Sequence, residues 1–292
     1  MILDELVAAT QRRIEREKEE ISPQEMRRLA QEAAQRQREA GGNGMPEFPF
    51  ERRLEQKGIH FICEVKKASP SKGLIAPDFP YLEIAREYEA AGADCISVLT
   101  EPDYFKGDLR YLREIAAEVE IPVLRKDFTI DEYMIDQAKV SGASVILLIC
   151  AILDQERLAR YLARADALGL SAIVEAHDED EVRMALEAGA RILGVNNRNL
   201  KDFTVDIGNS LRLREFAARE CAAAKAASAV SAVGSAADGA AGMPLFIAES
   251  GIRTGGDVEA LRAAGVNGVL IGETLMRAPD KAEQLRLLRG TV

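Results

Sequence analysis

The chain has 292 residues, 47% of them apolar and 29% charged, which excludes a disordered polymer and a short disulfide scaffold. At about 150 residues per domain this length allows two domains, but α/β barrels reach about 250 residues as one. The 38 basic and 48 acidic side chains give a net charge of −10 at pH 7. An acidic surface repels polyanions, so neither nucleic acid nor an anionic membrane is expected as a partner.

Cysteine and histidine are too sparse for a metal site built on them. The cysteines share no CxxC spacing and stand at Cys63, Cys95, Cys150 and Cys221, and the histidines at His60 and His177. Three of the cysteines lie in apolar runs, where buried free thiols are the ordinary interpretation. The N-terminus lacks the apolar core of a signal peptide, and no run approaches the about 18 apolar residues of a membrane span. A cytoplasmic protein is therefore expected.

The first 57 residues are predicted to form a helical extension. Their first segment places Ile2, Leu6 and Ile14 among apolar residues that recur at helical spacing, and glycines and prolines at 41–49 interrupt the pattern. Residues 58–292 have a different sequence pattern, in which short β-branched runs alternate with amphipathic segments. We therefore expect the extension to precede one catalytic domain.

Eight strands are predicted in residues 58–292. Five of the intervening helices end in a glycine suited to a left-handed cap. Continuous apolar runs suit a parallel sheet covered on both faces. Eight consecutive βα units predict a (β/α)₈ TIM barrel, and a doubly wound open sheet is the alternative. The expected strands are 60–66, 95–100, 121–126, 144–150, 171–176, 191–196, 245–249 and 268–272.

An alanine-rich segment, 217–241, fits this pattern poorly. Its first part is predicted to be a weakly anchored helix, and residues 228–242 a mobile insertion.

Polar residues gather at the predicted strand ends, where a barrel of this kind places its chemistry. With a period of two, Glu64 and Lys66 share the inward face of the first strand and Cys63 points outward. Other strands end in an ionisable or amide group, at Lys126, Glu175, Asn196 and Glu249. A single Lys–Glu pair is often only a satisfied ion pair. A packed core would not bury a whole ring of such groups, so a catalytic pocket is predicted.

Small residues after the last two strands indicate a phosphate site. Ser250, Gly251 and Gly272 allow the backbone to approach a ligand closely. Residues 254–257 open a helix whose amides could bind an anion, and a short turn after the eighth strand is the alternative. An acidic protein could hold a phosphorylated sugar in this way.

Six segments together resemble the indole-3-glycerol phosphate synthase family, and the resemblance spans nearly the whole chain. The family's fold is a (β/α)₈ barrel with an extra helical N-terminal segment. The alanine-rich insertion is longer than the resemblance leads us to expect, but it leaves the site residues in place. The segments are 2–14 (ILDELVAATQRRI), 64–73 (EVKKASPSKG), 99–107 (LTEPDYFKG), 124–128 (LRKDF), 194–200 (GVNNRNL) and 248–252 (AESGI).

The resemblance implies the reaction. 1-(2-Carboxyphenylamino)-1-deoxyribulose 5-phosphate closes its ring and loses carbon dioxide and water, giving indole-3-glycerol phosphate without a metal or organic cofactor. The chemistry needs an acid at the carbonyl oxygen and later at the leaving hydroxyl, and a base for a proton. A lysine whose pKa is lowered by a second cation suits the acid, and a glutamate suits the base.

The resemblance also implies roles for individual residues. Lys126 would be the general acid, and Glu175 its partner in the dehydration. Lys66 would hold the substrate carboxylate and could share the acid role, so the step at which each lysine acts stays open. Glu64 would orient the lysines, Asn196 would bind the reacting hydroxyl, and Glu249 is a further carboxylate of the site. Ser69 and Arg198 would line the pocket, and Phe128, with Pro70, would pack on the aromatic ring. The phosphate would be held by Ser250, Gly251 and Gly272.

Three other functions are compatible with a barrel of this kind but fit these residues less well. A phosphoribosylanthranilate isomerase would resemble a barrel with a cysteine base ending the first strand, where this chain has Lys66. A barrel aldolase would use Lys126 as a Schiff base, but would leave Glu64 and Asn196 unexplained. A non-catalytic phosphosugar-binding barrel would not need both lysines and Glu175. A monomer is expected, as in many members of the family.

Overall fold

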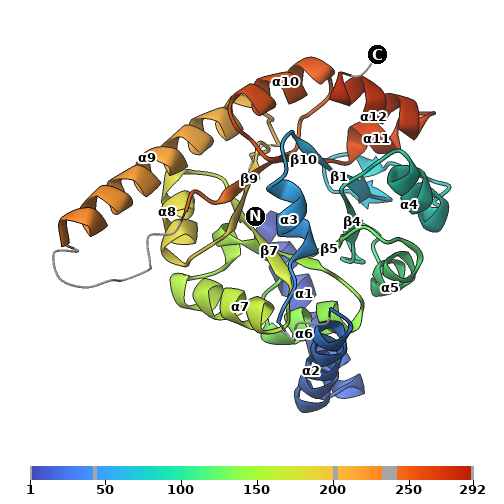
Figure 1. The fold of residues 1–292 in the computed structure, drawn as a ribbon. Helices are drawn as coiled ribbons and strands as arrows, with labels where there is room; N and C mark the ends of the chain where they lie inside the picture. Colours follow the sequence, from blue (N-terminus) through green and yellow to red (C-terminus); the bar gives the residue numbers. More distant parts are fainter. Residues whose placement is uncertain (1, 42–44, 200–202, 232–241, 291–292) are drawn as a thin grey trace.

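In the computed structural model the chain forms a closed barrel of eight parallel strands surrounded by helices (Figure 1). The structure describes residues 2–41, 45–199, 203–231 and 242–290. Neighbouring strands follow chain order around the barrel, and β1 pairs with β10 to close it. The predicted (β/α)₈ barrel is therefore confirmed. Its strands are β1 (His60–Val65), β4 (Cys95–Leu99), β5 (Val123–Lys126), β6 (Val145–Ile149), β7 (Ser171–Ala176), β8 (Ile192–Asn196), β9 (Leu245–Glu249) and β10 (Gly268–Ile271).

The predicted strands match the observed ones to within two residues at each end. Sequence reasoning missed a small hairpin after β1, formed by β2 (Ala68–Ser69) and β3 (Gly73–Leu74). Strands of two residues are too short to give a periodic signal.

Helices cover the outside of the barrel. All five glycines predicted to end helices have positive φ angles, at Gly92, Gly142, Gly169, Gly189 and Gly265. The helices of the barrel are α4 (Tyr81–Ala90), α5 (Leu109–Glu118), α6 (Glu132–Val140), the 3₁₀ turn η1 (Cys150–Ile152), α7 (Gln155–Ala167), α8 (Glu179–Glu187), α9 (Gly208–Ser231), α10 (Gly255–Ala263), α11 (Glu273–Met276) and α12 (Lys281–Arg289).

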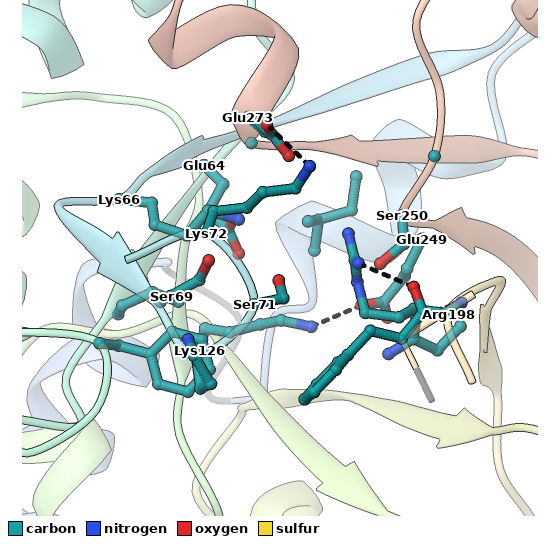
Figure 2. Close-up of a pocket in the computed structure, with 18 of the residues that line it drawn as sticks. Glu64, Lys66, Ser69, Ser71, Lys72, Lys126, Arg198, Glu249, Ser250 and Glu273 are labelled. Atoms are coloured by element: carbon teal, nitrogen blue, oxygen red, sulfur yellow. Dashed lines mark hydrogen bonds and ion pairs between the residues drawn. The ribbon is translucent and has the colours of Figure 1, made fainter. Parts of the chain in front are cut away.

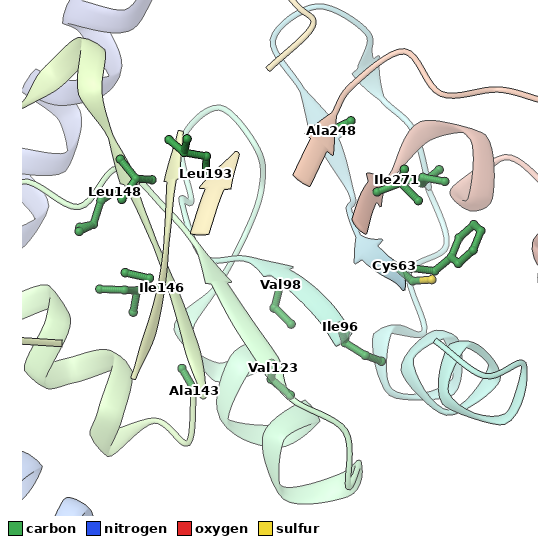
Figure 3. Close-up of a cluster of buried hydrophobic side chains, with 14 of the residues drawn as sticks. Cys63, Ile96, Val98, Val123, Ala143, Ile146, Leu148, Leu193, Ala248 and Ile271 are labelled. Carbon is green, nitrogen blue, oxygen red and sulfur yellow. The ribbon is translucent and has the colours of Figure 1, made fainter. Parts of the chain in front are cut away.

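Alternate residues of each strand point into two separate apolar cores. The outer core lies between strands and helices and includes Cys63, Val98 and Ile146 (Figure 3). The inner core fills the barrel and includes Ile62 and Leu147. This alternation confirms that Cys63 faces the helices, and it directs Glu64 into the barrel. The described thiols of Cys63, Cys95 and Cys150 are buried and free, as predicted.

The N-terminal segment forms three helices, α1 (Ile2–Glu20), α2 (Pro23–Ala40) and α3 (Pro49–Leu54). α3 lies across one end of the barrel (Figure 1), where Phe50 and Leu54 join the inner core. Glu51 binds Arg191 and the hydroxyl of Ser171 at the start of the neighbouring strands. α3 therefore closes the end of the barrel opposite the carboxyl ends of the strands.

The alanine-rich segment begins as part of α9, which continues to Ser231 and extends away from the barrel (Figure 1). The prediction of a helix in its first part is confirmed. The prediction of a mobile insertion at 228–242 is wrong for 228–231, which belong to α9, and its residues 232–241 lie outside the described part of the chain. Across the residues that the structure describes, no helix combines the length and apolar character that crossing a membrane requires.

Candidate active site

A cavity of about 830 Å³ opens at the carboxyl ends of the strands. This size is typical of a site for a small molecule. Most of the labelled side chains in Figure 2 point into it from different strands and loops. All twelve predicted site residues line the cavity: Glu64, Lys66, Ser69, Lys126, Phe128, Glu175, Asn196, Arg198, Glu249, Ser250, Gly251 and Gly272.

Lys126, at the end of β5, is held between two carboxylates. Its Nζ lies 2.5 Å from Oε2 of Glu249 and 3.4 Å from Oε2 of Glu175. Burial opposes the charge on Lys126, but these two carboxylates outweigh it and raise the pKa of the lysine. The sequence had suggested a lysine with a lowered pKa. The structure differs, because the nearest charges are negative and favour the protonated lysine.

Glu175, at the end of β7, is a buried carboxylate with polar groups around both oxygens. Asn196 donates from Nδ2 to its Oε1 at 3.4 Å. Burial would raise the pKa of Glu175, but the charge of Lys126 and then that of His177 lower it. Glu175 is therefore ionised at neutral pH, as a general base must be.

Glu249, at the end of β9, lies deeper than Glu175. Its Oε1 is buried and finds no hydrogen-bond partner among the residues that the structure describes. Burial raises the pKa of Glu249 to about 7, with the charge of Glu175 adding to this and Lys126 opposing it. Room for this carboxyl comes from Gly194 on the adjacent strand, where a Cβ would lie 2.6 Å from Oε1. Glu175 and Glu249 thus differ in charge although they share one lysine.

Glu64 and Lys66 form a second ion pair at the end of β1, with 2.5 Å between Nζ and Oε2. Gly272, which follows β10, makes this pair possible. A Cβ at Gly272 would overlap Oε2 of Glu64 and lie 2.7 Å from Nζ of Lys66. The role of Gly272 is thus partly to leave space for charged side chains.

The predicted phosphate end of the cavity has a backbone arrangement suited to an anion. Ser250 has a φ of 69° and Gly251 one of 81°, so both occupy the left-handed region. For a serine this conformation is strained, which is common at functional sites. Ser250 is held there by Asn197, whose Nδ2 donates to the carbonyl of Ser250 at 3.2 Å.

The helix start predicted as an anion site is already occupied by a carboxylate of the chain. α10 begins at Gly255 as expected, but Asp257 accepts hydrogen bonds from the backbone amides of Arg253 and Thr254. The turn from Gly272 to Thr274 instead lines the cavity.

One wall of the cavity is apolar. Phe128 and Phe105 lie with ring centroids 6.1 Å apart. Pro70 also lines the cavity. A flat aromatic ring could pack against such a wall.

Sequence reasoning missed the part that α1 plays in this site. Its apolar residues at helical spacing gave a signal, but the signal could not say which surface they cover. Three of the other omitted side chains, Lys72, Glu101 and Phe105, lie in the segments 64–73 and 99–107 that carry the resemblance, which assigned them no role. The main omissions are Ile2, Leu3, Leu6, Lys72, Glu101, Phe105, Arg253, Glu273 and Arg277.

The described residues contain no group of three His, Cys, Asp or Glu side chains arranged to hold a metal ion. The chemistry that these side chains can supply is proton transfer and charge stabilisation by two lysines and three glutamates.

Comparisons with known proteins agree over the length of the chain. The sequence model of the family described as indole-3-glycerol phosphate synthase matches residues 3–242 and 237–288. The chain is 49% identical over 291 residues to an indole-3-glycerol phosphate synthase of Ruminiclostridium cellulolyticum, with 100% of both chains covered. It is 51% identical over 283 residues to one of Lacticaseibacillus casei, covering 97% of this chain and 96% of the relative.

A solved structure of 3-hexulose-6-phosphate synthase superposes with a TM-score of 0.59 at 16% identity, covering 80% of this chain and 100% of that chain. At this identity the similarity shows the barrel fold alone. The full-length sequence matches decide the family. The chain belongs to the indole-3-glycerol phosphate synthase family.

Proposed function

We propose that this protein closes the ring of 1-(2-carboxyphenylamino)-1-deoxyribulose 5-phosphate, with loss of carbon dioxide and water, to give indole-3-glycerol phosphate. The main support for the proposal is the position of Lys126, which is charged and lies between Glu175 and Glu249 in a cavity with an apolar wall. Family membership supports the same reaction.

In the first step the aromatic carbon that bears the carboxylate attacks the C2′ carbonyl carbon. Lys126 donates its proton to the carbonyl oxygen as negative charge develops there, and the carboxylate leaves as carbon dioxide. Lys66 faces the same cavity and could bind the substrate carboxylate before it leaves. Glu64, 2.5 Å from Lys66, orients that lysine. Proton transfer by a positioned group of this kind contributes about 10²–10⁴-fold to a rate.

In the second step the C2′ hydroxyl takes a proton from Lys66 and leaves as water, and the carbon beside the nitrogen loses a proton. Glu175, kept ionised by its neighbours, is the base for that proton. Asn196, hydrogen-bonded to Glu175, holds the departing hydroxyl. Glu249 pairs with Lys126 on the side opposite Glu175 and stabilises the positive charge of the lysine.

The remaining predicted residues bind the substrate. The phosphate lies on the backbone around Ser250, Gly251 and Gly272, beside Arg198. Ser69 lines the cavity above the reacting groups, and Phe128 packs on the aromatic ring. A helix start and backbone amides hold such an anion without a positive overall charge.

We further propose that the protein acts as a monomer in the cytoplasm. Within the described surface, the large apolar side chains that are exposed are scattered, at Met45, Leu74, Phe203 and Leu287. A stable interface between subunits needs a contiguous apolar patch, which scattered residues do not provide.

The chain contains no tryptophan, so indole fluorescence can be followed with little protein background. Adding the substrate to the intact protein should produce this fluorescence. The variant Lys126→Ala should lose about 100-fold or more in kcat while largely keeping substrate binding. Absence of product with the intact protein would exclude the synthase reaction, and full activity of Lys126→Ala would exclude the role given to that lysine.

An aldolase that uses Lys126 as a Schiff base is the main rival chemistry. Schiff-base formation needs a neutral amine, whereas Glu249 and Glu175 raise the pKa of Lys126. Borohydride reduction in the presence of substrate should therefore trap no adduct, and a trapped adduct on Lys126 would favour the aldolase.

A further inference from the structure

His177 is a buried imidazole behind the proposed base, at the junction between β7 and α8. Its Nε2 is buried and has no hydrogen-bond partner in the described part of the chain, yet it lies 3.4 Å from Oε1 of Glu175. A buried polar nitrogen without a partner is costly unless another role retains it. Its short distance from Glu175 indicates that role.

The other face of the imidazole is fixed. Nδ1 lies 3.0 Å from Oε2 of Glu181, and the same oxygen accepts a hydrogen bond from the backbone amide of His177 at 2.8 Å. Asn209 of α9 donates to the backbone carbonyl of His177 at 3.2 Å. With Nδ1 held by Glu181, the Nε2 edge of the ring stays 3.4 Å from Oε1 of Glu175, so a protonated ring acts on that carboxylate through its charge.

Charge around His177 favours the protonated ring. Burial would lower the pKa of His177, but the hydrogen bond to Glu181 and the charges of Glu175, Glu181 and Glu249 raise it above its ordinary value. Among the described neighbours, α9 adds the neutral amide of Asn209. η1 adds the thiol of Cys150, whose pKa burial raises, so it stays uncharged at neutral pH.

The proposed reaction creates a need for this second cation. While Lys126 is charged, it compensates the buried carboxylate of Glu175 from 3.4 Å. Once Lys126 has given its proton to the substrate, Glu175 loses that compensation and its pKa rises. Glu175 would then bind a proton before the dehydration that needs it as a base.

We propose that His177, held by Glu181, is the positioning residue that keeps Glu175 ionised after Lys126 has given up its proton. The inference rests on the proposed function and concerns its second step. Removing the charge of His177 should therefore slow dehydration and leave the first, decarboxylating step almost unchanged.

The test follows both steps in one turnover. Substrate labelled with ¹⁴C in the carboxylate reports the first step as released carbon dioxide, and indole fluorescence reports the second. In His177→Asn we expect carbon dioxide release at nearly the wild-type rate and indole formation slower by about tenfold or more, since an adjacent opposite charge shifts a carboxyl pKa by about one to three units. An intermediate that has lost carbon dioxide but kept its hydroxyl should accumulate.

The pH profile provides a readout that a merely structural role would not change. Wild-type indole formation should fall as the pH rises through the raised pKa of His177, so the ratio of the wild-type rate to the His177→Asn rate should shrink toward one. Glu181→Gln should keep the ring in place but lower its pKa, so this decline should begin at lower pH.

His60→Asn is the matched control. His60 also pairs with a carboxylate, Asp94, at 3.2 Å, but it lies at the start of β1, away from the cavity. The substitution His60→Asn should leave the rates of both steps unchanged. Equal slowing of both steps by His177→Asn, with a ratio independent of pH, would overturn the inference. A wild-type protein that forms no indole would instead contradict the proposed function.

Discussion

Arg13 of α1 binds both carboxylate oxygens of Asp127, the residue after Lys126, at 2.9 and 2.8 Å. Asp127 also accepts hydrogen bonds from the hydroxyl of Thr100 at 2.5 Å and from Arg125 at 3.1 Å. The docking of the N-terminal helix and the position of Lys126 therefore depend on one buried ion pair. α1 contributes to the cavity both by its apolar residues and by this anchor.

Asp127→Asn should destabilise the fold and loosen α1. Burial would raise the pKa of Asp127, but the charges of Arg13 and Arg125 lower it to about 2. A carboxyl whose pKa is lowered on folding adds stability above its unfolded pKa, about 3.8, and this stability is lost as the pH falls toward 2. At pH 7 the variant should lose about 3 kcal/mol in the free energy of unfolding, measured by urea denaturation.

The loss should shrink below pH 4, because Asp127 of the unfolded wild-type chain takes up a proton there before the folded protein does. Glu25→Gln is the control, because it removes an exposed carboxylate that pairs with Arg28, and it should have no measurable effect. A loss for Asp127→Asn that does not change between pH 7 and pH 3 would contradict the electrostatic explanation.

Gly272→Ala should damage catalysis through the Glu64–Lys66 pair. The added methyl would occupy the space of the Glu64 carboxylate. Displacing a catalytic group by about 1 Å can cost about 100-fold in rate, so we expect kcat/KM to fall by about that factor. The control is Gly256→Ala, because the new Cβ would meet nothing closer than 3.6 Å. Wild-type kinetics for Gly272→Ala would show that the pair can move without cost.

Glu249→Gln should move the alkaline limb of the kcat profile to lower pH. Glu249 is the largest of the charges that raise the pKa of Lys126, so its neutral isostere should let Lys126 lose its proton about one pH unit earlier or more. The difference between the two proteins should shrink toward acid pH, because burial raises the pKa of wild-type Glu249 and the carboxyl takes up a proton there. An unchanged limb would mean that Lys126 is not the group that titrates. Glu259→Gln, an exposed position on α10, should leave the limb unchanged.

Phe50→Ala should destabilise the fold without altering the chemistry. Phe50 is fully buried in the inner core at the end of the barrel opposite the cavity. Truncating a buried phenylalanine costs about 3–5 kcal/mol, measured as the change in the free energy of unfolding. The kcat of the remaining folded protein should equal that of the wild type. A large loss of kcat would show that the two ends of the barrel are coupled.

Much of the barrel could be predicted because its strands carry local patterns. The period of two in β1 placed Glu64 inside and Cys63 outside, and the strand ends located Lys126 and Glu175. The position of a strand and the direction of its side chains depend on residues that are neighbours in sequence. The charge of Lys126 does not, because Glu249 lies 123 residues away. The apolar start of α1 predicted a helix but not its partner, since helical periodicity reveals a buried face and not the surface that covers it.

The anchors of the N-terminal segment affect the order in which the protein can fold during synthesis. Arg13 can form its ion pair only after Asp127, 114 residues later, has been synthesised. Glu51 likewise needs Arg191, 140 residues later. At about 5–20 residues per second, each interval lasts on the order of ten seconds on the ribosome. The apolar face of α1 stays without its final partners during that time. The part of the chain that is synthesised first therefore cannot be completed first.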